Sequence, residues 1–110
     1  MDKEKNWKNF KVTLPHRKPP YSKRNWGNGL HSLCSYQGKM KPSLVHHLIN
    51  VFSNKNQLVL DPFAGSGTTM FEASLQNRNS LGFDISKIAV AISHAKINNN
   101  NSKNILKILN

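Results

Sequence analysis

Apolar residues in the middle of the chain recur first at helical spacing and then in a short continuous run. Leu, Val, Leu, Ile and Phe occupy positions 44, 45, 48, 49 and 52, which form one face of a helix. Pro42 suits a first helical position, and Ser43 follows it, so the pattern predicts a helix from Pro42 to about Ser53. The run QLVL at residues 57–60 then predicts a short buried strand.

The same alternation repeats further along. Residues 68–76 have a helical pattern with Met70, Phe71, Ala73 and Ser74 on the inner side. Residues 80–84, SLGFD, predict a second strand, and residues 85–97 predict a second, largely apolar helix with Ser86 as its N-cap. The final stretch, NSKNILKILN, is compatible with a further helix or strand.

This order of elements predicts the fold class. Strand, glycine turn, helix, strand and helix form a βαβα unit, which is typical of an α/β fold with a parallel sheet. We therefore expect a partial Rossmann-like sheet with helices on both faces. Two or three strands do not complete such a sheet, and an open strand edge invites pairing with another chain.

The beginning of the chain has a different texture. Residues 1–42 hold four of the five prolines and five of the nine aromatic residues, without a long periodic run. We expect an extended basic arm over residues 1–42, followed by the α/β unit over residues 43–110.

Charge adds a candidate partner. The formal net charge is +11, and between Lys5 and Lys55 there are ten lysines and arginines and no carboxylate. Such a stretch suits a polyanion, and nucleic acid is the commonest one in cells. An alternative is a solvated linker whose aromatic residues lie against the neighbouring domain. The candidate nucleic-acid contacts, which mix cations with aromatic rings, are Arg17, Lys18, Tyr21, Lys23, Arg24 and Trp26.

Cysteine content and hydropathy bear on the cellular compartment and on membrane insertion. Cys34 is the only cysteine, so an internal disulfide is excluded and a reducing compartment, the cytoplasm, is the simplest expectation. The chain contains no apolar run of about 18 residues, so we expect no membrane span.

The turn after the first predicted strand is where a parallel α/β unit binds ligands. Gly65 and Gly67 allow unusual backbone dihedrals and close approach, whereas Asp61 disfavours a phosphate. The lysine of a phosphate-binding P-loop is missing, and only two of the three glycines of a dinucleotide motif occur. Asp84 ends the second strand, which is the position expected for an acid that hydrogen-bonds ribose hydroxyls. A ribose with an ammonium group and no pyrophosphate describes S-adenosylmethionine better than NAD.

Three segments resemble one enzyme family. DPFAGSGTT, residues 61–69, resembles motif I of the amino-directed nucleic-acid methyltransferases, which modify the exocyclic amine of adenine (N6) or cytosine (N4). KPSLVHHLI, residues 41–49, resembles motif X, and LGFDIS, residues 81–86, resembles motif II. Residues 15–43 are similar to the lead-in of site-specific DNA methyltransferases, some of which belong to restriction-modification systems.

The resemblance implies a site for S-adenosylmethionine. Asp61 and the following turn would surround the methionine part, Asp84 would take the ribose hydroxyls, and Lys41 and Ser43 would lie near the carboxylate. An alternative is that Asp61 and Asp84 merely cap a turn and a helix. The implied cofactor-binding residues are Lys41, Ser43, Asp61, Pro62, Phe63, Gly65, Ser66, Gly67, Thr68, Thr69 and Asp84.

The family's catalytic tetrapeptide has no counterpart here. It consists of Asp, Asn or Ser followed by Pro-Pro and an aromatic residue, which stacks on the flipped base. KPPY, residues 18–21, begins with a lysine, whose ammonium cannot accept a hydrogen bond from the target amine. We therefore predict no catalytic residue in this chain, which is expected to be inactive alone.

Several alternatives remain open. The chain could be a fragment, or one half of a split enzyme whose second polypeptide supplies the tetrapeptide and the remaining strands. It could also be a non-catalytic nucleic-acid-binding remnant or regulator, or part of an RNA methyltransferase. No metal site is predicted, because His46 and His47 are neighbours about 100° apart on a helix and Cys34 has no partner at ligand spacing.

Overall fold

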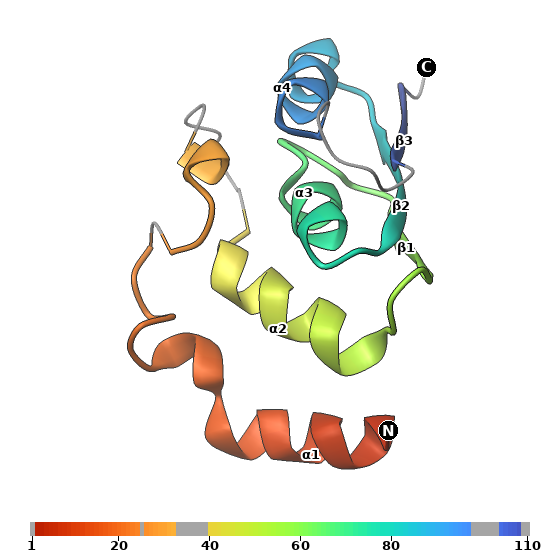
Figure 1. Ribbon diagram of the computed structural model, residues 1–110. Coiled ribbons are helices and arrows are strands. Elements are labelled where there is room, and N and C mark those ends of the chain that lie inside the picture. Colours follow the sequence, from red (N-terminus) through yellow and green to blue (C-terminus); the bar gives the residue numbers. More distant parts are fainter. Residues whose placement is uncertain (1, 25, 33–39, 98–103, 109–110) are drawn as a thin grey trace.

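The computed structural model describes residues 2–24, 26–32, 40–97 and 104–108, in which helices and short strands alternate (Figure 1). In chain order these are helix α1 (Lys3–Thr13), the 3₁₀ helices η1 (Pro15–Arg17) and η2 (Gly29–Ser32), helix α2 (Pro42–Phe52), strand β1 (Leu58–Asp61), helix α3 (Thr68–Leu75), strand β2 (Asn79–Asp84), helix α4 (Lys87–Ile97) and strand β3 (Asn104–Ile108).

The three strands form one parallel sheet in the order β1-β2-β3. Leu60 is paired with Leu81, and Leu81 with Ile105. Helix α3 connects β1 to β2, and α4 connects β2 to β3. The predicted α/β fold with a parallel sheet is therefore confirmed, and the final segment of unsettled type forms a strand.

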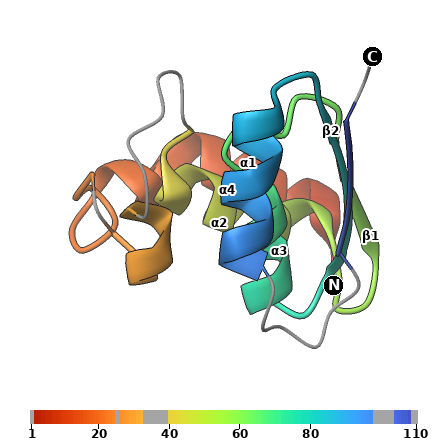
Figure 2. The same ribbon diagram turned by 90° about the horizontal axis from the view of Figure 1, so that it is seen from above.

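The described helices lie on one face of the sheet, although we expected helices on both faces. Figures 1 and 2 show α2, α3 and α4 on the same side of the strands. Successive right-handed crossovers in one direction place their helices on the same face, which explains the arrangement. The opposite face exposes Leu58, Leu60 and Ile105, with 63%, 59% and 49% of their surface accessible.

The core lies between the helices and the sheet. Met70 and Phe71 of α3 are fully buried and form one cluster with Ala64 of the glycine turn. A second cluster joins Val45 and Ile49 of α2 to Ala73 of α3, and Val59 of β1 contacts it. Burying these side chains holds α2 and α3 to the sheet and thereby positions the turn between β1 and α3.

The arm is not wholly extended, as we had expected, because α1 occupies eleven of its residues. The Asp2 side chain accepts a hydrogen bond from the Lys5 N–H at 3.1 Å and caps the helix. Trp7 contacts Phe52 of α2 with ring centroids 5.1 Å apart. The Lys3 ammonium also donates to the Ser53 carbonyl at 2.7 Å. These contacts with α2 stabilise a helix whose own sequence has weak amphipathic character.

A buried arginine joins the end of α2 to the start of β2. Arg78 Nε donates to Ser53 Oγ at 2.9 Å, Nη2 donates to the Ser53 carbonyl at 2.8 Å, and Nη1 donates to the Gln76 carbonyl at 2.8 Å. Burial lowers the pKa of Arg78. The guanidinium thus donates to carbonyl groups at the ends of two helices, where intrahelical donors are missing.

None of the helices in the described ranges is long and apolar enough to cross a membrane.

Candidate functional site

The carboxyl ends of β1 and β2 bring the two predicted acids to the same edge of the sheet. Asp61 is the last residue of β1 and is paired in register with Gly82, two residues before Asp84 at the end of β2. The turn of residues 62–67 leaves this edge and leads into α3. The sequence-based placement of Asp61, the glycine turn and Asp84 at one edge is therefore what the fold produces.

Asp84 holds this edge together through both carboxylate oxygens. Its Oδ2 accepts a hydrogen bond from the Gly65 N–H at 2.8 Å, and its Oδ1 accepts one from the Ser86 N–H at 2.8 Å. Ser86 in turn caps α4, because its Oγ accepts from the Ala89 N–H at 3.3 Å. Asp84 therefore supports the start of α4 through Ser86, whereas the Ser86 hydroxyl itself caps the helix. An ionised carboxylate has about four acceptor directions, so capacity for a ligand remains.

The two glycines of the turn serve different needs. Both have positive φ, 54° at Gly65 and 81° at Gly67, a region that favours glycine. A Cβ on Gly67 would lie 2.5 Å from Ser93 Oγ and 3.1 Å from the Ser93 Cα. The missing side chain of Gly67 therefore leaves room for the close approach of α4. The sequence pattern did not single out Ser93, because a serine on a helix carries no sign of a partner 26 residues away.

Buried hydroxyl groups without a partner line this turn. Ser66 Oγ and Thr68 Oγ1 are buried and have no hydrogen-bond partner in the described part of the chain, and the same holds for Ser43 Oγ at the start of α2. The first N–H groups of α3 also lack intrahelical acceptors, and Gly67 offers no side-chain cap. Unsatisfied buried polar groups of this kind are costly unless a ligand pairs with them. This donor and acceptor set fits a small zwitterionic cofactor.

The first residues of the turn are more exposed. Asp61 is half-buried, and its Oδ1 accepts from the Phe63 N–H at 3.0 Å, which shapes the turn. Pro62 is exposed, and 85% of the Phe63 surface is accessible. The first part of the turn is therefore open to solvent at Pro62 and Phe63, whereas Ser66 and Thr68 are buried.

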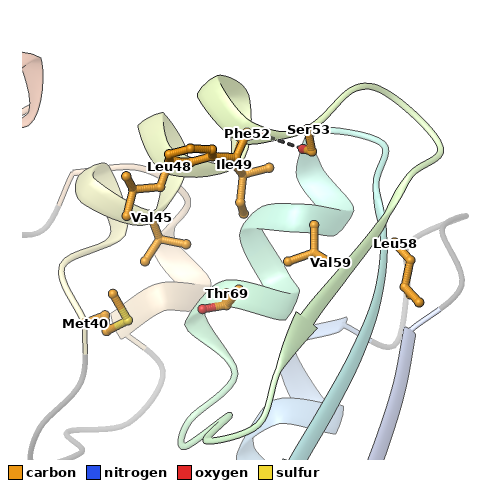
Figure 3. Close-up of a pocket in the computed structure, with 9 residues that line it drawn as sticks. All are labelled: Met40, Val45, Leu48, Ile49, Phe52, Ser53, Leu58, Val59 and Thr69. Carbon is orange, nitrogen blue, oxygen red and sulfur yellow. Dashed lines mark hydrogen bonds between the residues drawn. The ribbon is translucent and has the colours of Figure 1, made fainter. Parts of the chain in front are cut away.

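The start of α2 lies close to the start of α3. Met40 and Thr69 line the same end of an apolar groove of about 290 Å³, as Figure 3 shows. Lys41 points elsewhere, because its Nζ donates to the His16 carbonyl at 2.9 Å. Of the predicted cofactor residues only Thr69 lines the groove. The groove itself runs along β1 between α2 and the sheet edge, and is lined by Met40, Val45, Leu48, Ile49, Phe52, Ser53, Leu58, Val59 and Thr69.

The predicted nucleic-acid contacts divide into two groups. The four cations Arg17, Lys18, Lys23 and Arg24 are exposed. The rings of the two aromatic residues instead contact each other, with centroids 5.0 Å apart. Both rings lie against α2, because the ring centroid of Tyr21 is 4.5 Å from that of His47 and the ring centroid of Trp26 is 4.8 Å from that of His46. This matches the alternative in which the aromatic residues lie on the neighbouring domain. The cations remain accessible to a polyanion.

Two histidines in this region are less basic than usual. Burial lowers the pKa of His16, and the nearby charges of Arg17 and Lys41 lower it further. Burial also lowers the pKa of His47, together with the charges of His46 and His16. The rings of both residues lie near Phe10, at 5.5 Å and 6.4 Å between centroids.

We expect the protein to lose stability as pH falls below about 6.5. The unfolded chain binds protons on His16 and His47 near the ordinary pKa, while the folded chain takes them up only at lower pH, so the free energy of unfolding decreases through this window. Thermal unfolding between pH 7.5 and 5.5 should show a falling midpoint. His47→Gln should flatten the dependence, whereas His94→Gln on the exposed side of α4 should not. Equal slopes in all three proteins would contradict this assignment.

No group of three or more metal-ligating side chains occurs among the residues that the structure covers. Cys34 lies outside the described residues.

Comparisons with known proteins show the family of the chain. The family model described as DNA methylase matches residues 2–95. The chain is 30% identical to the type II methyltransferase M.MjaII of Methanocaldococcus jannaschii over 112 residues, which cover 99% of this chain and 21% of the relative. It is 38% identical to the type II methyltransferase M.HindIII of Haemophilus influenzae over 69 residues, covering 60% of this chain and 22% of the relative. The chain thus spans about a fifth of the length of these relatives.

Proposed function

The chain belongs to the DNA methylase family, and we propose that it forms the S-adenosylmethionine-binding part of an enzyme that methylates adenine N6 or cytosine N4 in DNA. The supporting observation is the set of buried, unpaired hydroxyl groups of Ser66 and Thr68 in and after the turn whose Gly65 N–H donates to the Asp84 carboxylate. The matching family is described as a DNA methylase, which favours DNA over RNA as the substrate. We further propose that this enzyme acts in the cytoplasm.

The residues of the turn would each have a separate task. Asp84 would accept hydrogen bonds from the ribose hydroxyls while keeping Gly65 and Ser86 in place. Ser66, Thr68 and the N–H groups at the start of α3 would pair with the polar groups of the methionine part. When bound, S-adenosylmethionine supplies an electrophilic methyl group on its sulfonium. This chain would orient the donor and would leave activation of the target amine to residues outside it.

A calorimetric titration with S-adenosylmethionine tests the proposal. We expect saturable binding that weakens at least about tenfold in Thr68→Val, because valine keeps the shape of threonine and removes its unpaired hydroxyl. The same substitution should leave the free energy of unfolding unchanged or raise it, since an unsatisfied buried group disappears.

Thr13→Val is the matched control. Its hydroxyl donates to the Asn9 carbonyl on α1, away from the turn, and its loss should not change the affinity. Equal affinity in Thr68→Val and the unmodified protein, measured with both folded, would refute a cofactor contact at this hydroxyl.

We further propose that the exposed cations of the arm contact DNA phosphates. Four such contacts predict a slope of about −3.6 in a plot of log affinity against log salt, or about a hundredfold loss between 50 and 200 mM salt. Replacing Lys23 and Arg24 with glutamine should reduce the slope by about 1.8, whereas Lys55→Gln, in the loop before β1, should leave it unchanged. A flat affinity across this range would rule out contacts dominated by phosphates.

A second polypeptide is proposed to supply the catalytic tetrapeptide and the remaining strands. In the described residues β1 pairs with β2 on one side only. The Gln57 carbonyl accepts from the Asn79 N–H at 2.9 Å, so the alternation along the strand directs the backbone groups of Leu58 and Leu60 away from β2. The apolar groove borders this free edge. These features would suit an added strand.

Co-purification with the part of M.MjaII that this chain does not match would test the assembly. Leu60→Pro should weaken it, because proline removes a donor at the free edge and leaves the β2 pairing intact. Assembly that is insensitive to Leu60→Pro would exclude pairing at this edge.

A further inference from the structure

A buried carboxylate in the middle of α3 receives one histidine from the arm and one from α2. Glu72 Oε1 lies 2.7 Å from His31 Nε2, and Glu72 Oε2 lies 3.2 Å from His46 Nδ1. The side chains of Glu72 and His31 each expose 3% of their surface, and that of His46 exposes 26%. Two oxygens of one acid therefore join three segments that are far apart in the sequence.

Local structure presents His31 to this acid. Asn28 Oδ1 accepts from the Leu30 N–H at 2.9 Å, and the Asn28 carbonyl accepts from the His31 N–H at 3.0 Å, which forms the short helix η2. The His31 ring then lies edge-on to Phe71, with centroids 4.9 Å apart. On the other side, His46 contacts Trp26, the first residue of the same stretch of the arm.

We propose that Glu72 is the positioning residue that seats residues 26–32 of the arm against α3. A buried carboxylate needs donors, and here both come from imidazole rings. Burial alone would raise the pKa of Glu72, but the hydrogen bonds and charges of His31 and His46 outweigh burial and lower the pKa overall. An ionised Glu72 accepts only, so His31 carries a proton on Nε2 and His46 carries one on Nδ1.

The contacts of His31 and His46 with Glu72, which seat residues 26–32 against α3, persist over a defined pH range. The titratable groups that face these contacts are Tyr21 from the arm and His47 from α2, with His16 of η1 beyond His47. These hydrogen bonds require only that Glu72 stays ionised and that each ring presents an N–H to it. The contacts therefore persist through mildly acidic pH, and they weaken only when pH falls below the ordinary Glu72 pKa of about 4.5 toward its lower folded value.

The role differs from that of the cofactor turn. Glu72 lies one helical turn after the start of α3 and contacts neither Asp84 nor the glycines through any described hydrogen bond. It fixes the stretch that directly follows the exposed Lys23 and Arg24, and so sets where the proposed DNA contacts stand relative to the cofactor turn. The seating itself requires neither DNA nor S-adenosylmethionine, so its test is independent of the proposed function.

Nitrogen-15 NMR of the histidine rings at pH 7.5 gives the decisive readout. We expect His46 to carry its proton on Nδ1 in the unmodified protein and to move to Nε2 in Glu72→Ala, while His94 on α4 stays unchanged. Tryptic cleavage after Arg24, relative to cleavage after Lys87, should become at least about tenfold faster in Glu72→Ala, because two hydrogen bonds to a charged group are lost.

Further variants separate seating from general destabilisation. Glu72→Gln keeps the shape and one acceptor, and should restore slow cleavage in part. His46→Ala removes one attachment at a partly exposed position, and should speed cleavage even if Glu72→Ala fails to fold. A proton on Nε2 of His46 in the unmodified protein, or unchanged relative cleavage in His46→Ala, would overturn the proposal.

Discussion

Replacing Gly67 with alanine is expected to lower the free energy of unfolding by about 2–5 kcal/mol. The backbone there has a φ of 81°, which strains an L-residue, and the new methyl group would lie 2.5 Å from Ser93 Oγ and 2.7 Å from Ser93 Cβ. The Ser93 backbone is only 3.1 Å away, so α4 would have to shift. Urea denaturation followed by circular dichroism measures the loss.

Gly27→Ala is a matched control, because it separates backbone strain from steric overlap. Gly27 also has a positive φ, 100°, but an added Cβ would meet its nearest atoms at ordinary contact distances of 3.5 and 3.8 Å. It should therefore cost only about 1–2 kcal/mol. Ser93→Gly should recover part of the loss in the Gly67→Ala background. Equal losses at Gly27 and Gly67 would show that contact with α4 is unimportant.

Asp84→Ala is expected to reduce both stability and cofactor affinity. The substitution leaves the Gly65 and Ser86 N–H groups without their charged acceptor, which should cost about 2–4 kcal/mol in unfolding free energy. Because the turn would no longer be held, and the proposed ribose contact would vanish, affinity for S-adenosylmethionine should fall at least about a hundredfold. Denaturation and calorimetry on the same preparation measure the two effects.

Asp84→Asn distinguishes the two roles. An amide keeps one oxygen acceptor, so it can still pair with one of the two N–H groups, and we expect an intermediate loss of stability. If folded Asp84→Ala binds the cofactor as tightly as the unmodified protein, then Asp84 has only a structural role. That is the alternative considered from the sequence.

The elements around the turn were predictable because their signals in the sequence are local. The strand expected at residues 57–60 is β1, Leu58–Asp61, and the strand expected at residues 80–84 is β2, Asn79–Asp84. The expected N-cap Ser86 accepts from the Ala89 N–H. Short apolar runs bounded by turn residues and a capped helix are signals within a few residues of each other.

The remaining features depend on partners distant in sequence, which local pattern does not report. Arg78 lies in the short connection between α3 and β2, yet it is buried against Ser53, 25 residues away. In the sequence, Glu72 is a single polar position within a helical pattern. Its donor His31 lies 41 residues away, so the local pattern does not indicate it. The helix α1 likewise depends on aromatic contacts with α2. The sequence also gives no sign of the close contact between Gly67 and Ser93, which lie 26 residues apart.

The hydrogen bonds that Asp84 accepts from Gly65 and Ser86 have a consequence for how the gene can be rearranged. The acids, the glycine turn and the serine that fills the space beside Gly67 all fall between residues 61 and 93. The hydrogen bonds of Asp84 and the close contact between Gly67 and Ser93 are therefore encoded in one uninterrupted stretch, whereas α2 adds packing from outside it. Moving the stretch to another position in a gene, or into a separate gene, would leave those contacts intact, so the block is suited to exchange as a unit.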